Sequence, residues 1–256
     1  MYLARTIEKS IQKVSDFFPV LLVTGPRQVG KTTILQACGA EKRNYVSLDT
    51  LENRSLAQND PALFLQRFKA PLLIDEIQYA PQLFPYIKSI VDEQKQSGMY
   101  WLTGSQQFHL MKNVSESLAG RVGILHLEGF SQAERDGQPE RLPFLPTPEA
   151  IEARASHAPK TDIVSIFHQI WKGAYPKMHG ADDDMWQLFY NAYVQTYIER
   201  DIRELGNVGN ELDFLKFMKV LAARTGQLLN YSDIARDVGV SAPPSRHGCP
   251  CSRLRG

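Results

Sequence analysis

Cysteine is scarce in this sequence, and neither sign of charge is in excess. The 256 residues include three cysteines, Cys38, Cys249 and Cys251, which do not make a disulfide framework, so a reducing compartment fits them best. Lysine and arginine total 29 against 28 aspartate and glutamate residues, a formal net charge of +1. This balance argues against a global electrostatic field for nucleic acid or a membrane surface, but it does not exclude a local patch.

Long hydrophobic runs are also missing. Residues 1–5 lack the apolar segment of a signal peptide, and no later run is long enough to cross a bilayer. We therefore expect a cytoplasmic protein with no membrane partner. Apolar residues make up 43% of the chain and charged residues 22%, which is typical of an ordinary globular protein. The length leaves room for one large domain, or for a large domain followed by a smaller one.

A glycine-rich stretch lies near the start of the chain, between an apolar run and a helix-forming run. Residues 21–33 read LLVTGPRQVGKTT and contain the spacing G-x-x-x-x-G-K-T. This strand–loop–helix context is what a phosphate-binding loop requires. Gly25 and Gly30 allow backbone angles that a Cβ would block, so successive N–H groups can turn toward a phosphate. The alternative is a chance glycine turn between a core strand and a helix.

Individual residues of this loop receive roles from the same physics. The helix that begins near Lys31 adds its unsatisfied N–H groups and the positive end of its dipole. Lys31 is expected to reach the β- and γ-phosphates of a nucleotide, and the hydroxyl of Thr32 to bind Mg²⁺. The predicted nucleotide-binding residues are Gly25, Pro26, Arg27, Gln28, Val29, Gly30, Lys31, Thr32 and Thr33.

Two carboxylates follow a second apolar run, at residues 71–76, which read PLLIDE. Ligands of open α/β sheets bind at the carboxyl ends of the strands. Asp75 is therefore a candidate metal ligand, and Glu76 a candidate to orient and deprotonate an attacking water. The alternative is a strand that ends in a solvated acidic turn.

Ser105 and Arg121 complete the candidate catalytic residues. Ser105 follows the predicted strand 100–103, where it could contact the γ-phosphate or the attacking water, cap the next helix, or do both. Arg121 follows a predicted helix C-cap at Gly120 and precedes the predicted strand 122–127. It could stabilise transition-state charge in its own site or in a neighbouring subunit. Otherwise it is a surface arginine paired with Glu116 or Glu128.

The remaining pattern predicts an α/β domain followed by a mostly helical region. Apolar residues at helical spacing predict a helix near residues 3–14, and residues 45–49 read as a strand. Thr50 is a candidate cap of the next helix, and Pro61 and Pro81 are candidate starts of further helices. We place the first domain at 1–136 and a proline-rich linker with a short helix at 151–155 in the segment 137–162.

The helical region is placed at 163–241. Its aromatic stripe at residues 186, 190, 193 and 197 is interpreted as core because it repeats at helical spacing, and the charges at 199–201 are interpreted as structural pairs. Residues 230–241 resemble the front of a helix-turn-helix, with a cap, a short helix and a glycine turn.

A recognition helix does not follow that turn. Residues 242–256 have no apolar periodicity, and Pro243 and Pro244 block a helix, so we expect an unstructured tail. Cys249 and Cys251 are too few for a zinc site, which usually needs four ligands. The abrupt change in composition motivates the hypothesis that a frameshift or truncation produced this tail.

Together these segments resemble prokaryotic AAA+-type ATP-binding proteins, in which a P-loop domain precedes a C-terminal domain of unknown function. The resemblance rests on residues 25–33, 72–78, 102–105 and 117–121, and then on 173–176, 197–201 and 230–241. It implies ATP and Mg²⁺ as ligands, a sensor role for Ser105, a finger role for Arg121 and a homo-oligomer. Family members generally continue past residue 241 into a winged helix and a restriction-endonuclease-like fold. This chain departs from them there, so any activity of those parts is expected to be missing.

The predicted fold is therefore an AAA+-like P-loop NTPase with a parallel sheet flanked by helices, followed by helices and a partial winged helix. The leading functional hypothesis is ATP hydrolysis by a nucleotide-dependent switch or motor. A nucleic-acid-binding regulator that senses ATP is one alternative, with a nucleic acid or protein partner at the C-terminal region. A truncated, defective family member is the other.

Overall fold

The computed structural model describes residues 2–39, 42–105, 114, 116–139, 145–157, 161–197 and 211–240. The backbone contacts divide the chain into two compact units, residues 1–181 and 182–256. The predicted tail at 242–256 and the charges at 199–201 lie outside the described residues. No helix in the described part of the chain is long and apolar enough to cross a membrane.

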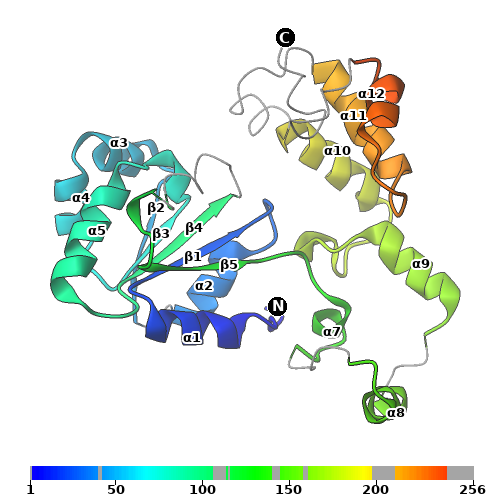
Figure 1. The fold of residues 1–256 in the computed structure, drawn as a ribbon, viewed down its shortest axis with the longest axis horizontal. Coiled ribbons are helices and arrows are strands. Elements are labelled where there is room, and N and C mark those ends of the chain that lie inside the picture. The colour runs from blue at the N-terminus through cyan, green and yellow to red at the C-terminus, as the bar shows by residue number, and fades with distance from the viewer. Residues whose placement is uncertain are drawn as a thin grey trace. The chain divides into compact units, whose positions relative to one another are not determined.

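The first unit is built on a parallel sheet of five strands in the order β2-β3-β4-β1-β5 (Figure 1). The strands are β1 (Val20–Gly25), β2 (Asn44–Ser47), β3 (Leu72–Asp75), β4 (Tyr100–Ser105) and β5 (Val122–His126). The helix α1 (Glu8–Phe17) precedes β1. The strands are connected by α2 (Lys31–Gly39), α3 (Leu51–Asn59), α4 (Pro61–Arg67), the 3₁₀ turn η1 (Ile77–Tyr79) and α5 (Leu83–Gln94). This confirms the predicted α/β class with a parallel sheet flanked by helices.

Helices cover both faces of the sheet. Successive side chains of a strand point to opposite faces, so the apolar run of a strand places apolar side chains on both. Val20 and Leu22 of β1 pack in one apolar cluster with residues of α4 and α5, among them Phe64, Phe84 and Ile87. Leu21 and Val23 pack in a second cluster with residues of α1 and α2, among them Ile11, Ile34 and Leu35. The continuous apolar run of β1 is thus explained by burial on both faces.

The register brings the carboxyl ends of three strands to one edge. Gly25 of β1 pairs with Ser105 of β4, and Ile74 of β3 pairs with Leu102 of the same strand. The chain leaves β1 through α2 on one face and returns through helices on the other face. Open α/β sheets bind ligands at the carboxyl ends of the strands, at the point where connections pass to opposite faces of the sheet.

A buried arginine fastens the N-terminal segment to the chain after β5. The guanidinium of Arg5 donates to the carbonyl of Val29 (3.1 Å) and to that of Glu128 (2.8 Å), and it lies 3.1 Å from a carboxylate oxygen of Glu134. Both ionic side chains are only 5% exposed. Glu134 also accepts the amide of Thr6 at 2.8 Å. Because Val29 belongs to the glycine-rich loop, this cluster ties the loop to the N-terminal segment.

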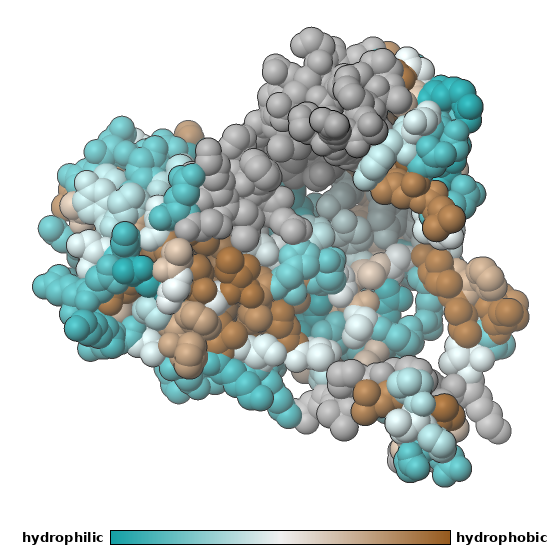
Figure 2. Space-filling model, in the orientation of Figure 1, coloured by the Kyte–Doolittle hydropathy of each residue, from teal (hydrophilic) through white to brown (hydrophobic). Residues whose placement is uncertain are grey.

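The chain after β5 adds α7 (Gln132–Arg135), α8 (Pro148–His157), α9 (Ile163–Lys172) and the 3₁₀ turn η2 (Pro176–Met178) to the first unit. The short helix expected at 151–155 is longer at both ends. Apolar side chains of α9 are exposed, with Val164 at 73% and Phe167 at 64%, and Figure 2 shows apolar residues gathered there. The predicted domain limits, with a linker at 137–162, stay a prediction, and the contact boundary falls after Ala181.

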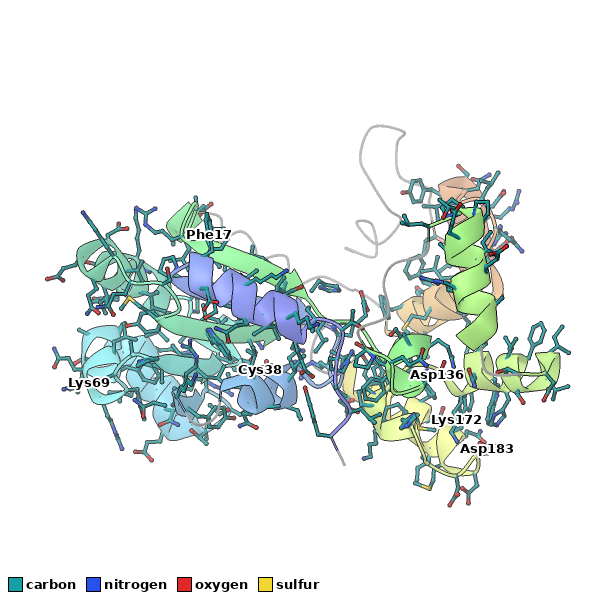
Figure 3. All side chains as sticks on the ribbon, turned by 90° about the horizontal axis from the view of Figure 1, so that it is seen from below. Phe17, Cys38, Lys69, Asp136, Lys172 and Asp183 are labelled. Atoms are coloured by element: carbon teal, nitrogen blue, oxygen red, sulfur yellow. The ribbon has the colours of Figure 1, made fainter. Side chains whose placement is uncertain are left out.

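A cavity of about 260 Å³ lies between α7, α9 and η2. Asp136 and Lys172, labelled in Figure 3, are among its lining residues, together with Arg135, His168 and His179. None of the residues predicted to bind a nucleotide lines this cavity.

The second unit contains α10 (Met185–Tyr197), α11 (Glu211–Ala223) and α12 (Tyr231–Val238). Phe217 of α11 packs with Ile234 and Val238 of α12 in a small apolar cluster. On α10 the rings of Trp186 and Tyr190 lie 5.1 Å apart and are half-buried. The helical character predicted for this region is therefore confirmed.

The front of the predicted helix-turn-helix has the expected local structure. The side chain of Asn230 accepts the amides of Ser232 and Asp233 and so caps α12. Gly239 ends the helix in the left-handed conformation. A second helix would fall on residues from 241 onward, outside the described part of the chain.

Candidate nucleotide site

The glycine-rich loop joins β1 to α2 and has the backbone angles that its sequence predicts. Gly25 has a φ of +143° and Gly30 a φ of +92°. A Cβ at Gly25 would lie 2.1 Å from the carbonyl oxygen of Leu127, so a side chain is excluded by the fold itself. A Cβ at Gly30 would meet no described atom within 4 Å, so the space beside this glycine is open. Open space at the start of a helix is compatible with an anionic group.

Lys31 is the first residue of α2, and its side chain folds back over the loop. Its Nζ donates to the carbonyl oxygens of Gly25 (3.0 Å) and Pro26 (2.8 Å), and the residue is only 6% exposed. The ammonium group of Lys31 is thus held against the first two residues of the loop, where it could contact a phosphate. Val29 differs, because its side chain is buried in the core and only its main chain can serve a ligand. Gln28 and Thr33 have exposed side chains.

Asp75, the last residue of β3, is buried and tied to the loop. Its Oδ1 accepts a hydrogen bond of 2.6 Å from the hydroxyl of Thr32 and another from the hydroxyl of Thr103 on β4. Its Oδ2 accepts from the phenol of Tyr45 at 3.3 Å. Burial and the nearby charge of Asp75 raise the pKa of Tyr45, which keeps this phenol a donor. The structure therefore brings together the two residues predicted to bind Mg²⁺.

These two side chains fit the chemistry of Mg²⁺. Mg²⁺ is usually bound by one or two carboxylates together with phosphate oxygens and water, not by a full protein cage. In the part of the chain that is described, no cluster of three or more histidine, cysteine, aspartate or glutamate side chains could hold a metal. A hydroxyl and a carboxylate beside the glycine-rich loop are oxygen ligands of the kind that Mg²⁺ takes beside a nucleotide phosphate.

Glu76 lies in a tight turn beside β4. Its backbone is left-handed, with φ 59° and ψ 48°, and its amide donates to the hydroxyl of Thr103 at 3.0 Å. Its carboxylate accepts a hydrogen bond from the side-chain amide of Gln78, which also donates to the hydroxyl of Ser105 at 3.2 Å. The predicted base and the predicted sensor are therefore linked through one glutamine.

Arg121 lies away from these residues. It precedes β5, and its carbonyl accepts the amide of Val20 at the start of β1. Arg121 therefore lies at the amino ends of the strands, whereas Gly25 lies at their carboxyl ends. Its guanidinium forms a two-pronged ion pair with Asp92 of α5, with Nη2 2.8 Å from Oδ2. The pairing with Glu116 or Glu128 considered from sequence is therefore wrong in its partner. Arg121 does not join Lys31 and Asp75 within one chain.

Sequence reasoning missed several residues that touch the site. Thr103 and Tyr45 both donate to Asp75, and Gln78 holds Glu76. The position of Gln78, two residues after Glu76, could have indicated from the sequence that the two side chains lie close together. Thr103 and Tyr45 lie on neighbouring strands, so their roles depend on a strand order that no local pattern supplies.

Comparison with known proteins bears on the domain organisation and the fold. Residues 18–135 match a family described as an AAA domain, and residues 164–247 match a family described as a domain of unknown function, DUF8612. Among solved structures, a Walker-type ATPase of Pyrococcus abyssi superposes with a TM-score of 0.53 and 13% identity, over 91% of this chain and 87% of that one. A likeness at this identity bears on the fold alone.

The curated relatives include uncharacterised proteins of Mycobacterium bovis and Mycobacterium tuberculosis. Each is 28% identical over 235 residues, which are 89% of this chain and 46% of the relative. The chain thus spans about half the length of the curated relatives it matches.

Proposed function

We propose that this chain, whose residues 18–135 match an AAA domain family and whose residues 164–247 match the DUF8612 family, binds ATP with Mg²⁺ and hydrolyses it to ADP and phosphate. It would act as a nucleotide-dependent switch or motor. The observation that carries this proposal is the 2.6 Å hydrogen bond between Thr32 and Asp75, two residues 43 positions apart. A chance glycine turn gives no reason for a buried carboxylate to meet the loop at this point.

Each side chain of the site has a task in this reaction. Lys31 would exchange its bonds to the loop carbonyls for bonds to phosphate oxygens, and the main-chain N–H groups from Arg27 to Thr33 would bind the remaining charge. Mg²⁺ held by Thr32 and Asp75 would supply positive charge to the phosphate oxygens.

Glu76 is the proposed base. It would accept a proton from water while the water oxygen bonds to the γ-phosphorus. The bond from that phosphorus to the bridging oxygen breaks, and its electron pair leaves with ADP.

We further propose that Arg121 serves the site of a neighbouring subunit. It lies at the amino ends of the strands, whereas the loop of its own chain lies at their carboxyl ends, so it cannot reach a phosphate bound there. Hydrolysis per molecule should then rise with protein concentration, because assembly would supply the missing positive charge.

The test is phosphate release from Mg²⁺·ATP at several protein concentrations. Lys31→Ala should lose nucleotide binding and hydrolysis, while Glu76→Gln should bind ATP but release no phosphate. Lys69→Ala, at an exposed lysine labelled in Figure 3, is the matched control and should behave as the wild type. Phosphate release that survives both Lys31→Ala and Glu76→Gln would refute the proposal.

Nucleic acid binding is a second candidate, supported by the capped α12 and its glycine turn, which form the front half of a helix-turn-helix. A chain with a net charge of +1 makes this the weaker candidate. Binding of the whole chain to a duplex, weakening steeply with salt, would promote it. Binding that is absent at low salt would remove it.

A further inference from the structure

We propose that Gln78 is a positioning residue that orients Glu76 and Ser105 together for ATP hydrolysis, an inference that rests on the function proposed above. Gln78 lies in η1, two residues after Glu76, and comes from neither the loop nor a strand. Its Nε2 donates to Oε2 of Glu76 and, at 3.2 Å, to Oγ of Ser105. One side chain thus contacts both groups expected to flank the attacking water and the γ-phosphate.

The donor capacity of this amide is fully used by the two contacts. An amide nitrogen carries two hydrogens, and here one points to Glu76 and the other to Ser105. Turning the amide over would place its oxygen against the carboxylate of Glu76, so that two acceptors would face each other. The carboxylate therefore fixes which end of Gln78 faces the site.

The two hydrogen bonds that Gln78 donates, to Glu76 and to Ser105, form a fork. This fork also fixes the direction of the Ser105 hydroxyl hydrogen. A hydroxyl has one hydrogen and two acceptor lone pairs. Because Ser105 accepts a hydrogen from Gln78, its own hydrogen must point elsewhere and is available as a donor. A donor is what an anionic γ-phosphate needs.

For Glu76 the consequence is complementary. Gln78 occupies Oε2 and leaves Oε1 as an acceptor for the hydrogen of a water. The backbone of Glu76 is held by Thr103 in a left-handed conformation that a glutamate rarely adopts. Such conformations persist where the surroundings fix them, and they are concentrated at functional sites. Gln78 extends this control from the main chain to the carboxylate.

A role in stability alone does not account for Gln78. Within the described residues, its Oε1 is buried without a hydrogen-bond partner. An unpaired buried acceptor costs stability, so an apolar side chain of similar length should be tolerated by the fold. Loss of the fork and loss of stability can therefore be separated by one substitution.

The experiment compares Gln78→Met with Gln82→Met, a matched change at an exposed glutamine four positions away. We expect Gln78→Met to retain the thermal midpoint and to bind a fluorescent ATP analogue within about threefold of the wild type. Its kcat should fall at least about tenfold, because a displacement of about 1 Å in a reacting group can cost about 100-fold. Gln82→Met should match the wild type in all three measurements.

Ser105→Ala in both backgrounds tests whether the two groups act as a unit. If Gln78 orients Ser105, the combined loss in kcat should be smaller than the product of the two single losses. Gln78→Met with wild-type kcat would overturn the inference, as would a fall in thermal midpoint and nucleotide affinity that accounts for the lost activity. These outcomes require an active wild type, whereas a wild type without Glu76-dependent phosphate release would refute the proposed function instead.

Discussion

Gly30→Ala separates the binding role of the loop from its structural role. Gly30 has a φ of +92° and no described atom within 4 Å of where its Cβ would be, so alanine adds backbone strain without a clash. Strain of this kind costs about 1–3 kcal/mol, and in a domain of this size it lowers the thermal midpoint by about 2–12 °C. The new methyl group would also occupy the space in which a phosphate is expected.

We therefore expect Gly30→Ala to weaken nucleotide affinity at least about tenfold, which corresponds to about 1.4 kcal/mol. Titration with a fluorescent ATP analogue and thermal unfolding of the same samples give the two quantities. Gly137→Ala is the matched control, because Gly137 also has a positive φ (+70°) and open space beside it, and it lies outside the loop. Its thermal midpoint should fall similarly while its affinity is unchanged.

Gly25→Ala should behave differently from both. Its Cβ would lie 2.1 Å from the carbonyl oxygen of Leu127. Overpacking costs about 1–3 kcal/mol and the strain a similar amount, so we expect a loss of stability of about 2–6 kcal/mol. Equal nucleotide affinity in folded Gly30→Ala and Gly137→Ala would refute the reasoning, since it would mean that the open space beside Gly30 does not receive the phosphate.

Three further predictions concern the ion pairs. Arg5→Met should lower the free energy of unfolding by about 3–5 kcal/mol, because it leaves the buried carboxylate of Glu134 without its cation; a denaturant titration in which Arg5→Met matches the wild type would contradict this. Burial would raise the pKa of Glu134, but the amides of Ser131 and Thr6 and the charge of Arg5 outweigh it, so its pKa lies below 4.5. Its contribution to stability is thus present above pH 4.5 and lost as pH falls through the lower folded pKa, and Glu134→Gln should flatten that part of the profile of thermal midpoint against pH. Arg121→Ala should abolish the rise of hydrolysis with protein concentration and leave ATP affinity unchanged, whereas a wild-type concentration dependence would remove the finger role.

Local sequence was informative wherever a function depends on neighbours along the chain. The positive φ angles of Gly25 and Gly30 follow from the spacing of the loop, and burial of β1 on both faces follows from its unbroken apolar run. The cap at Asn230 was predictable for the same reason. The cap expected at Thr50 was wrong in its hydrogen bond, because that hydroxyl donates to the carbonyl of Ser47 instead.

The strand order is a different matter, since it depends on crossovers that no local pattern specifies. Only the pairing of β3 with β4 puts Thr103 beside Asp75, and only the turn after β3 brings Gln78 to Ser105. The sequence by itself determined the loop, the two acids and the α/β class, because each depends on residues within one turn or strand. Tertiary structure decided which side chains support them and placed Arg121 at the amino ends of the strands, because those contacts form between segments distant in the chain.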